Sequence, residues 1–160
     1  MARVRQLIAA FGLSVAAGCG AAQPPPAELA GLWSAGEAAC RGGVGVEFGA
    51  EAIAAVYEDE RQVLFQHPRY EVEAHGDAFR VRIRYELPRL AGGARSAGAH
   101  GVVVLERDGA MIGPVSHTLV DPRTGAARIR ISGDPAVTAL TLTPCGPHPW
   151  REPLRGRSQV

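Results

Sequence analysis

Histidine and serine are the side chains here that could support acid–base or nucleophilic chemistry. Ser116 and His117 are neighbours, but adjacent strand residues point to opposite faces, so they do not easily share a hydrogen bond. There is no Gly-x-Ser-x-Gly motif either. Metal sites often include two ligands a few residues apart, and no such pair occurs among the histidines. We therefore predict a non-enzymatic protein without a metal or a cofactor. The five histidines are His67, His75, His100, His117 and His148.

Arginine provides a second candidate surface. Alternation places three arginines on one face of a predicted strand and two on one face of another. If these strands are neighbours, five guanidinium groups share a face that could contact anionic lipid headgroups, lipopolysaccharide phosphates or an acidic partner. The alternative is a solvated face with salt bridges to Glu71 and Glu73. The five residues are Arg80, Arg82, Arg84, Arg128 and Arg130.

The residues before Cys19 have the pattern of an export signal. Arg3 and Arg5 precede an apolar run over Leu7–Ala17, and Gly18 then precedes the cysteine. The run is too short for a transmembrane helix, which needs about 20 apolar residues. With the cysteine placed after small residues, the segment resembles the signal sequence and lipobox of bacterial lipoproteins. That family usually has Leu, Val or Ile three residues before the cysteine, where this chain has Ala16.

This resemblance implies a processed, membrane-anchored protein. In the family, the cysteine thiol takes a diacylglyceryl group, the signal is removed before it, and the new amino terminus is acylated, for example with palmitate. Several acyl chains on one residue suffice for stable anchoring. Because Gly20 rather than aspartate follows Cys19, the resemblance favours the outer membrane. The implied location is the bacterial cell envelope, at the periplasmic face or the cell surface.

Lipidation of Cys19 would leave Cys40 and Cys145 as a pair. An odd cysteine count in an exported protein needs such an explanation, and the exported compartment permits disulfides. No C-x-x-C motif or close histidine pair favours a metal or redox role. We therefore predict a disulfide that joins the start of the domain to its last strand. A closed loop of about 100 residues contributes roughly 4 to 5 kcal/mol in the chain-entropy model.

The chain divides into four predicted parts: a signal peptide (1–18), a lipidated cysteine with a Pro-rich tether (19–27), one domain (28–146) and a flexible tail (147–160). Two of the 17 basic residues lie in the signal, so 15 basic and 16 acidic residues remain. This balance argues against nucleic-acid binding.

Glycine and proline interrupt the domain every 8 to 12 residues, with period-two alternation between them. The clearest unit is a hairpin over Tyr70–Tyr85 with a two-residue turn at Gly76-Asp77. Its expected register pairs Glu73 with Arg80, Glu71 with Arg82 and Val72 with Val81. Further strands are predicted at Val44–Phe48, Ala52–Tyr57, Gln62–Gln66, Gly101–Glu106, Val115–Val120, Ala126–Ile131 and Val137–Thr143.

Such a strand count predicts an all-β fold: a small antiparallel up-and-down β-barrel or a β-sandwich of about 8–9 strands. Gly31-Leu32-Trp33 resembles the G-x-W motif that opens lipocalin-like (calycin) barrels, although the second motif of that family, Thr-Asp-Tyr, is absent. The resemblance implies that Trp33 plugs the closed end of a barrel. It implies no ligand-binding residues.

These observations predict a membrane-tethered envelope lipoprotein that binds an apolar small molecule or lipid inside its barrel. The alternative is a protein-interaction module, such as an inhibitor or assembly factor of an envelope complex. That alternative would act through a protruding loop such as Ala91–Ala99.

Overall fold

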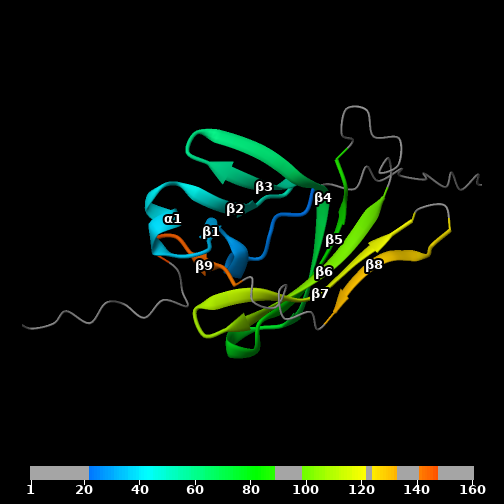
Figure 1. The fold of residues 1–160 in the computed structure, drawn as a ribbon. Coiled ribbons are helices and arrows are strands. Elements are labelled where there is room, and N and C mark those ends of the chain that lie inside the picture. The colour runs from blue at the N-terminus through cyan, green and yellow to red at the C-terminus, as the bar shows by residue number, and fades with distance from the viewer. Residues whose placement is uncertain (1–21, 89–98, 122–123, 133–140, 148–160) are drawn as a thin grey trace, which may run out of the picture.

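The computed structural model describes residues 22–88, 99–121, 124–132 and 141–147, with only the backbone described for 128–132. These residues form nine strands and three short helical segments (Figure 1). The strands are β1 (Leu32–Ser34), β2 (Val44–Phe48), β3 (Ala52–Tyr57), β4 (Glu60–Ala74), β5 (Arg80–Glu86), β6 (His100–Asp108), β7 (Met111–Val120), β8 (Ala127–Ser132) and β9 (Thr143–Pro144). The helical segments are η1 (Ala27–Leu29), α1 (Glu37–Arg41) and η2 (Gly76–Ala78).

All nine strands belong to one antiparallel sheet in the order β8-β7-β6-β5-β4-β3-β2-β1-β9. Each strand from β1 to β8 pairs with its neighbour in the chain, so the predicted all-β, up-and-down fold is confirmed. As far as the described residues go, the sheet is not closed into a barrel. Within the described residues, a single bridge between Ile112 of β7 and Leu142 links the far strands to the segment that enters β9.

Strand β4 replaces two of the predicted strands. It runs for 15 residues and covers both Gln62–Gln66 and the first arm of the Tyr70 hairpin. A register irregularity between Gln66 and Arg69 interrupts its pairing with β5, and His67 there has a left-handed φ of 48°. The His67 N–H donates to the Glu51 carbonyl at 2.9 Å. The chain thus bulges at this point and continues as one strand.

The connection from β4 to β5 is the 3-10 segment η2, whereas a two-residue turn was predicted. An irregularity between Val72 and Ala74 places Arg80 opposite Ala74, so the predicted Glu73–Arg80 register is wrong. The pairs Glu71–Arg82 and Val72–Val81 are confirmed. The longer connection brings Phe79 into the core, where its side chain is completely buried.

The core lies between the two halves of the folded sheet. Trp33 is completely buried, and its indole N–H donates to the Leu29 carbonyl at 3.2 Å. In β5 the residues alternate between the core and the outer face, as period-two patterning requires. The buried cluster comprises Leu29, Trp33, Phe48, Ile53, Tyr70, Phe79, Val81, Ile83, Leu105 and Ile112.

The predicted disulfide between Cys40 and Cys145 is present, with the two Cα atoms 5.4 Å apart. Cys40 lies in α1, a five-residue helix that the sequence pattern did not predict because it is too short to show a period. Cys145 directly follows β9. The bond therefore joins the helix after the first strand to the strand that pairs with it.

Several predicted features lie outside the described residues. They are the signal segment with Cys19, the tail beyond Pro147 with His148, residues 91–98 of the loop, and most of the strand predicted at Val137–Thr143. Among the helices that the structure does describe, none has the length and apolar character needed to cross a bilayer.

Candidate functional site

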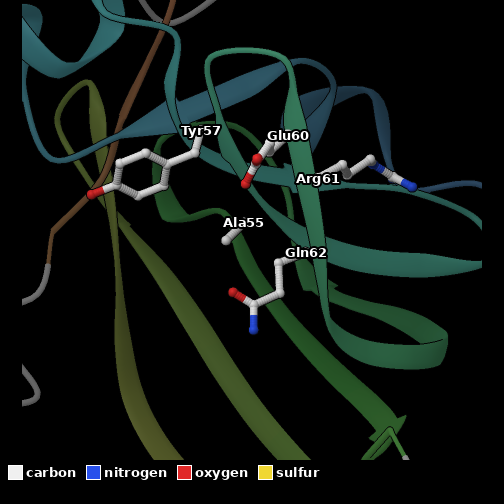
Figure 2. A pocket seen from close by; sticks show the side chains of 5 residues that line it. All are labelled: Ala55, Tyr57, Glu60, Arg61 and Gln62. Atoms are coloured by element: carbon white, nitrogen blue, oxygen red, sulfur yellow. The ribbon is translucent and has the colours of Figure 1, made fainter.

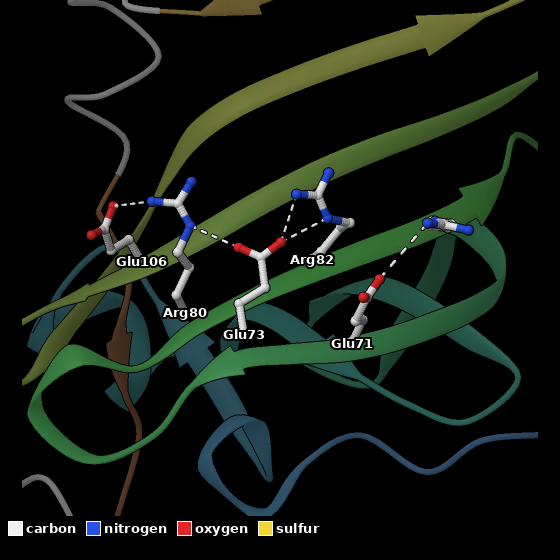
Figure 3. Close-up of polar contacts among 6 residues, drawn as sticks. Glu71, Glu73, Arg80, Arg82 and Glu106 are labelled. Atoms are coloured by element: carbon white, nitrogen blue, oxygen red, sulfur yellow. Dashed lines mark hydrogen bonds and ion pairs between the residues drawn. The ribbon is translucent and has the colours of Figure 1, made fainter.

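Two of the β5 arginines on the outer face are held by carboxylates (Figure 3). Arg80 Nε lies 2.9 Å from Glu73 Oε2, and its Nη1 lies 3.3 Å from Glu106 Oε2. Arg82 Nη2 lies 2.6 Å from the other oxygen of Glu73. Hydrogen bonds from Arg82 and then Arg80 lower the pKa of the Glu73 carboxyl. These contacts are those of a salt-bridged face.

Arg84 and the β8 arginines are placed differently. Arg84 Nη2 lies 3.7 Å from Glu71 Oε2, and the two side chains are 67% and 63% exposed. Strands β6 and β7 separate β5 from β8, where Arg128 and Arg130 lie. The condition for a single surface of five arginines, that the two strands are neighbours, is therefore not met.

The inner face carries an aromatic cluster formed by Phe65 of β4, Tyr85 of β5 and His117 of β7. The Phe65 and Tyr85 ring centroids are 3.9 Å apart, and the Phe65 and His117 centroids are 6.5 Å apart with the rings edge to face. The Tyr85 hydroxyl hydrogen-bonds to His117 Nε2. Tyr85 is almost completely buried, whereas Phe65 and His117 are only partly buried. We call these three residues the aromatic cluster.

Glycine makes room for this cluster. Gly101 of β6 lies directly opposite Tyr85 in the sheet, and a Cβ at Gly101 would overlap the tyrosine ring and its hydroxyl. The absence of a side chain therefore lets the Tyr85 ring lie across β6 toward His117 on the next strand.

Burial sets the protonation state of the tyrosine–histidine pair. It lowers the pKa of His117 and raises the pKa of Tyr85, so both groups are neutral around pH 7. Because a phenol hydroxyl is a stronger donor than an imidazole N–H, we assign the hydroxyl as the donor to Nε2, which places the imidazole proton on Nδ1. Nδ1 makes no hydrogen bond within the described part of the chain. The inner face thus presents one hydrogen-bond donor beside an aromatic ring.

Sequence pattern alone did not bring this cluster together. His117 was weighed as a metal ligand and as a partner of Ser116, which lies on the opposite face of β7. Phe65 and Tyr85 had no assigned role. The alternation of each strand does place His117, Tyr85 and Phe65 on inward positions, but the register of Phe65 relative to Tyr85 depends on the irregularity between Gln66 and Arg69 in β4.

The other described histidines lie on the surface. His67 Nδ1 is 3.2 Å from Glu86 Oε2, and His75 Nδ1 is 3.2 Å from Glu28 Oε1. Within the described ranges, no three or more His, Cys, Asp and Glu side chains gather closely enough to hold a metal ion.

The hairpin of β3 and β4 presents a second surface (Figure 2). Tyr57, at the end of β3, is 66% exposed, and the side chains of Tyr57 and Glu60 project from the paired ends of the two strands. Glu58 in the turn has a left-handed φ of 52°. A shallow cavity of about 340 Å³ is lined by Ala55, Tyr57, Glu60, Arg61 and Gln62.

Comparisons of the chain with protein-family models, with curated proteins and with solved structures gave no match.

Proposed function

We propose that this chain is a lipid-anchored, non-enzymatic binding protein of the bacterial cell envelope, and that the inner face of its sheet binds an apolar small molecule. The aromatic cluster is the observation that carries this proposal. Phe65 and His117 are only partly buried although they lie on the core side of the sheet. Binding sites for small molecules combine apolar and aromatic walls with a few polar groups that fix orientation.

The cluster favours a particular ligand chemistry. The Phe65 ring offers an apolar surface, and His117 Nδ1 offers one donor. Partly buried Val103 and Leu119 lie on the same face, next to Gly101 and His117 in the ladder. A molecule with an apolar body and a single hydrogen-bond acceptor, such as a carbonyl or carboxylate, matches this arrangement.

The anchor is the second part of the proposal and rests on the lipobox resemblance around Cys19. Incorporation of labelled palmitate into the protein expressed in a bacterial host tests it. The wild type should incorporate the label and be found in the membrane fraction, and Cys19→Ala should do neither. Labelling that persists in Cys19→Ala would contradict it.

Ligand binding can be tested by fluorescence titration with N-phenyl-1-naphthylamine, an apolar probe with a weak polar group. Phe65→Ala should weaken binding several-fold because it removes the partly exposed ring of the cluster. Val63→Ala is the matched control, since it truncates an exposed apolar side chain on the same strand. Equal affinity of both variants for the probe, with both folded by circular dichroism, would contradict the assignment of the inner face as the ligand-binding surface.

A second candidate function, a protein-interaction module, is favoured by the β3–β4 hairpin. Large exposed aromatic side chains are typical of interface anchors, and Tyr57 is such a residue beside an acidic turn, Glu58-Asp59-Glu60. The partner would be an envelope protein with a basic surface. A photo-crosslinking residue at Tyr57 should capture one defined partner in cells. The same residue at exposed Thr124 serves as the control, and an identical pattern from both positions would count against this function.

A further inference from the structure

The segment that precedes β1 is bound to the domain along its length. The Gln23 side chain donates from Nε2 to the Tyr70 carbonyl at 2.7 Å, and its Oε1 accepts from the Tyr70 N–H at 3.2 Å. At the other end of the segment, Leu29 is completely buried in the core. We call residues 22–29 the N-terminal strap (blue in Figure 1).

The strap fills a gap in the sheet. Strand β3 pairs with β4 only as far as Gln66, so the β4 backbone beyond that residue has no strand partner on this side. The Gln23 amide satisfies the N–H and the C=O of Tyr70 together, as a neighbouring strand would. This contact fixes the point at which the chain leaves the domain toward Cys19.

Covalent geometry limits how far the proposed anchor lies from that point. Cys19 precedes Ala22 by three residues. An extended chain of that length spans at most about 11 Å. A lipidated Cys19 must therefore hold the surface around Ala22 close to the bilayer.

That surface surrounds the β4 bulge. One cavity of about 240 Å³ is lined by Ala22, Ala50, Glu51, His67, Pro68 and Arg69. An adjoining cavity of about 390 Å³ is lined by His67, Arg69, Arg84, Tyr85, Glu86 and His100. The two share His67 and Arg69, and together they form what we call the anchor-side surface.

We propose that the anchor-side surface rests on the headgroup layer of the bilayer, and that the strap, rather than charge, sets this orientation. The proposal rests on the lipid anchor at Cys19 proposed above. The bilayer is the expected contact of this surface because only a short length of chain separates Ala22 from the acylated residue.

The charges of this surface argue against electrostatic steering. Arg69 and Arg84 are matched by Glu51 and Glu86, and Glu71 pairs with Arg84. His67 faces Glu86. The three carboxylates outnumber the two arginines on this surface, so the orientation should be the same on zwitterionic and anionic bilayers.

The opposite pole of the domain should point away from the membrane. Asp108 lies eight residues from His100 along β6. That separation is about 27 Å at the rise of an antiparallel strand. Arg107 Nη1 donates to the Gly76 carbonyl at 2.9 Å, so the β4–β5 and β6–β7 turns lie together at this pole.

Paramagnetic broadening of backbone amides tests the orientation. The acylated full-length protein is placed in nanodiscs of phosphatidylcholine doped with a gadolinium-chelate headgroup lipid. The proposal expects amides of His67, Arg69 and Arg84 to broaden several-fold more than those of Gly76 and Gly109. Substituting part of the lipid by phosphatidylglycerol should leave this gradient unchanged.

Two variants test whether the strap causes this gradient of amide broadening. Gln23→Ala should flatten the gradient because the chain can leave β4, whereas Gln62→Ala, elsewhere on β4, should preserve it. The proposed orientation would be wrong if the acylated wild type showed uniform or reversed broadening, or a gradient only with phosphatidylglycerol. Those results would leave the lipid anchor itself unaffected. Absence of palmitate labelling would instead remove the anchor itself.

Discussion

At the scale of single residues, the hydrogen bond between Tyr85 and His117 makes the inner face sensitive to pH. Because burial lowers the pKa of His117, the folded state binds this proton less well than the unfolded chain. The stability that neutral His117 contributes is complete above the pKa of histidine in the unfolded chain. It is lost as pH falls through that value toward the lowered pKa of His117 in the folded protein.

The unfolding free energy of the wild type should therefore fall more steeply than that of His117→Gln as pH decreases from about 7 to about 5. The difference in slope cannot exceed about 1.4 kcal/mol per pH unit, the limit for one proton, and partial exposure of the ring reduces it. Urea unfolding at a series of pH values measures it. Parallel curves for the two proteins would show that His117 is not the titrating group.

Gly101 should tolerate no side chain. Gly101→Ala is expected to destabilise the protein by about 1 to 3 kcal/mol, the usual cost of overpacking a well-packed site. The reason is that the new Cβ overlaps the Tyr85 ring.

Chemical denaturation measures this loss, and a second background identifies its cause. In Tyr85→Leu the same substitution should cost much less, because the ring that it meets is gone. An equal cost in both backgrounds would place the strain elsewhere in β6.

Glu73 should make its contribution with the same sign but over a lower pH range. Hydrogen bonds from Arg82 and Arg80 lower the pKa of this carboxyl, so its stabilising effect is present above the unfolded pKa and is lost as pH falls through the folded value. Glu73→Gln should be less stable than the wild type at pH 7, and the difference should narrow as pH falls below the ordinary carboxyl pKa. Thermal unfolding at a series of pH values checks this, with Glu71→Gln as the control for a looser pair. A difference that stays constant as pH falls would contradict the ionic origin.

At the scale of elements, the disulfide joins α1 to the end of β9. The strand β9 has only two residues, so its place beside β1 depends on few backbone contacts. The paired substitution Cys40→Ser with Cys145→Ser should lower the unfolding free energy by about 2 to 5 kcal/mol. Guanidinium unfolding measures the loss, and reduction of the wild type should reproduce it. A variant as stable as the wild type would show that β9 is held by its packing alone.

The prediction of strands from sequence was correct where the sequence signal is local. Alternation located β2 and β3 to the residue. Local signals did not predict the bulge at His67, which merged two strands into β4. They also did not predict η2, since that segment forms because Phe79 enters a core built from distant strands.

The candidate site was harder to predict for the same reason. The aromatic cluster combines residues from β4, β5 and β7, and its geometry requires the register of all the strands between them. The arginines were predicted to share one face only if β5 and β8 are neighbours, and sheet order, rather than alternation, decides which strands are neighbours. Alternation indicates which residues of one strand share a face, whereas only the fold shows which strands lie side by side.

At the scale of the whole molecule, the described structure places different features on different regions. The aromatic cluster lies on the inner face, the ion pairs of Arg80 and Arg82 lie on the outer face, and the strap lies beside the β4 bulge. Tyr85 belongs both to the aromatic cluster and to the lining of the anchor-side surface, so the ligand surface that we propose adjoins the proposed membrane contact.

Native mass spectrometry of the acylated protein, extracted from its own envelope in mild detergent, tests the central claim most directly. The account predicts a bound small molecule of low polarity on the wild type, and its loss or sharp reduction in Phe65→Ala but not in Val63→Ala. A wild-type protein that carries only its acyl chains, or a ligand retained equally by both variants, would contradict binding at the aromatic cluster.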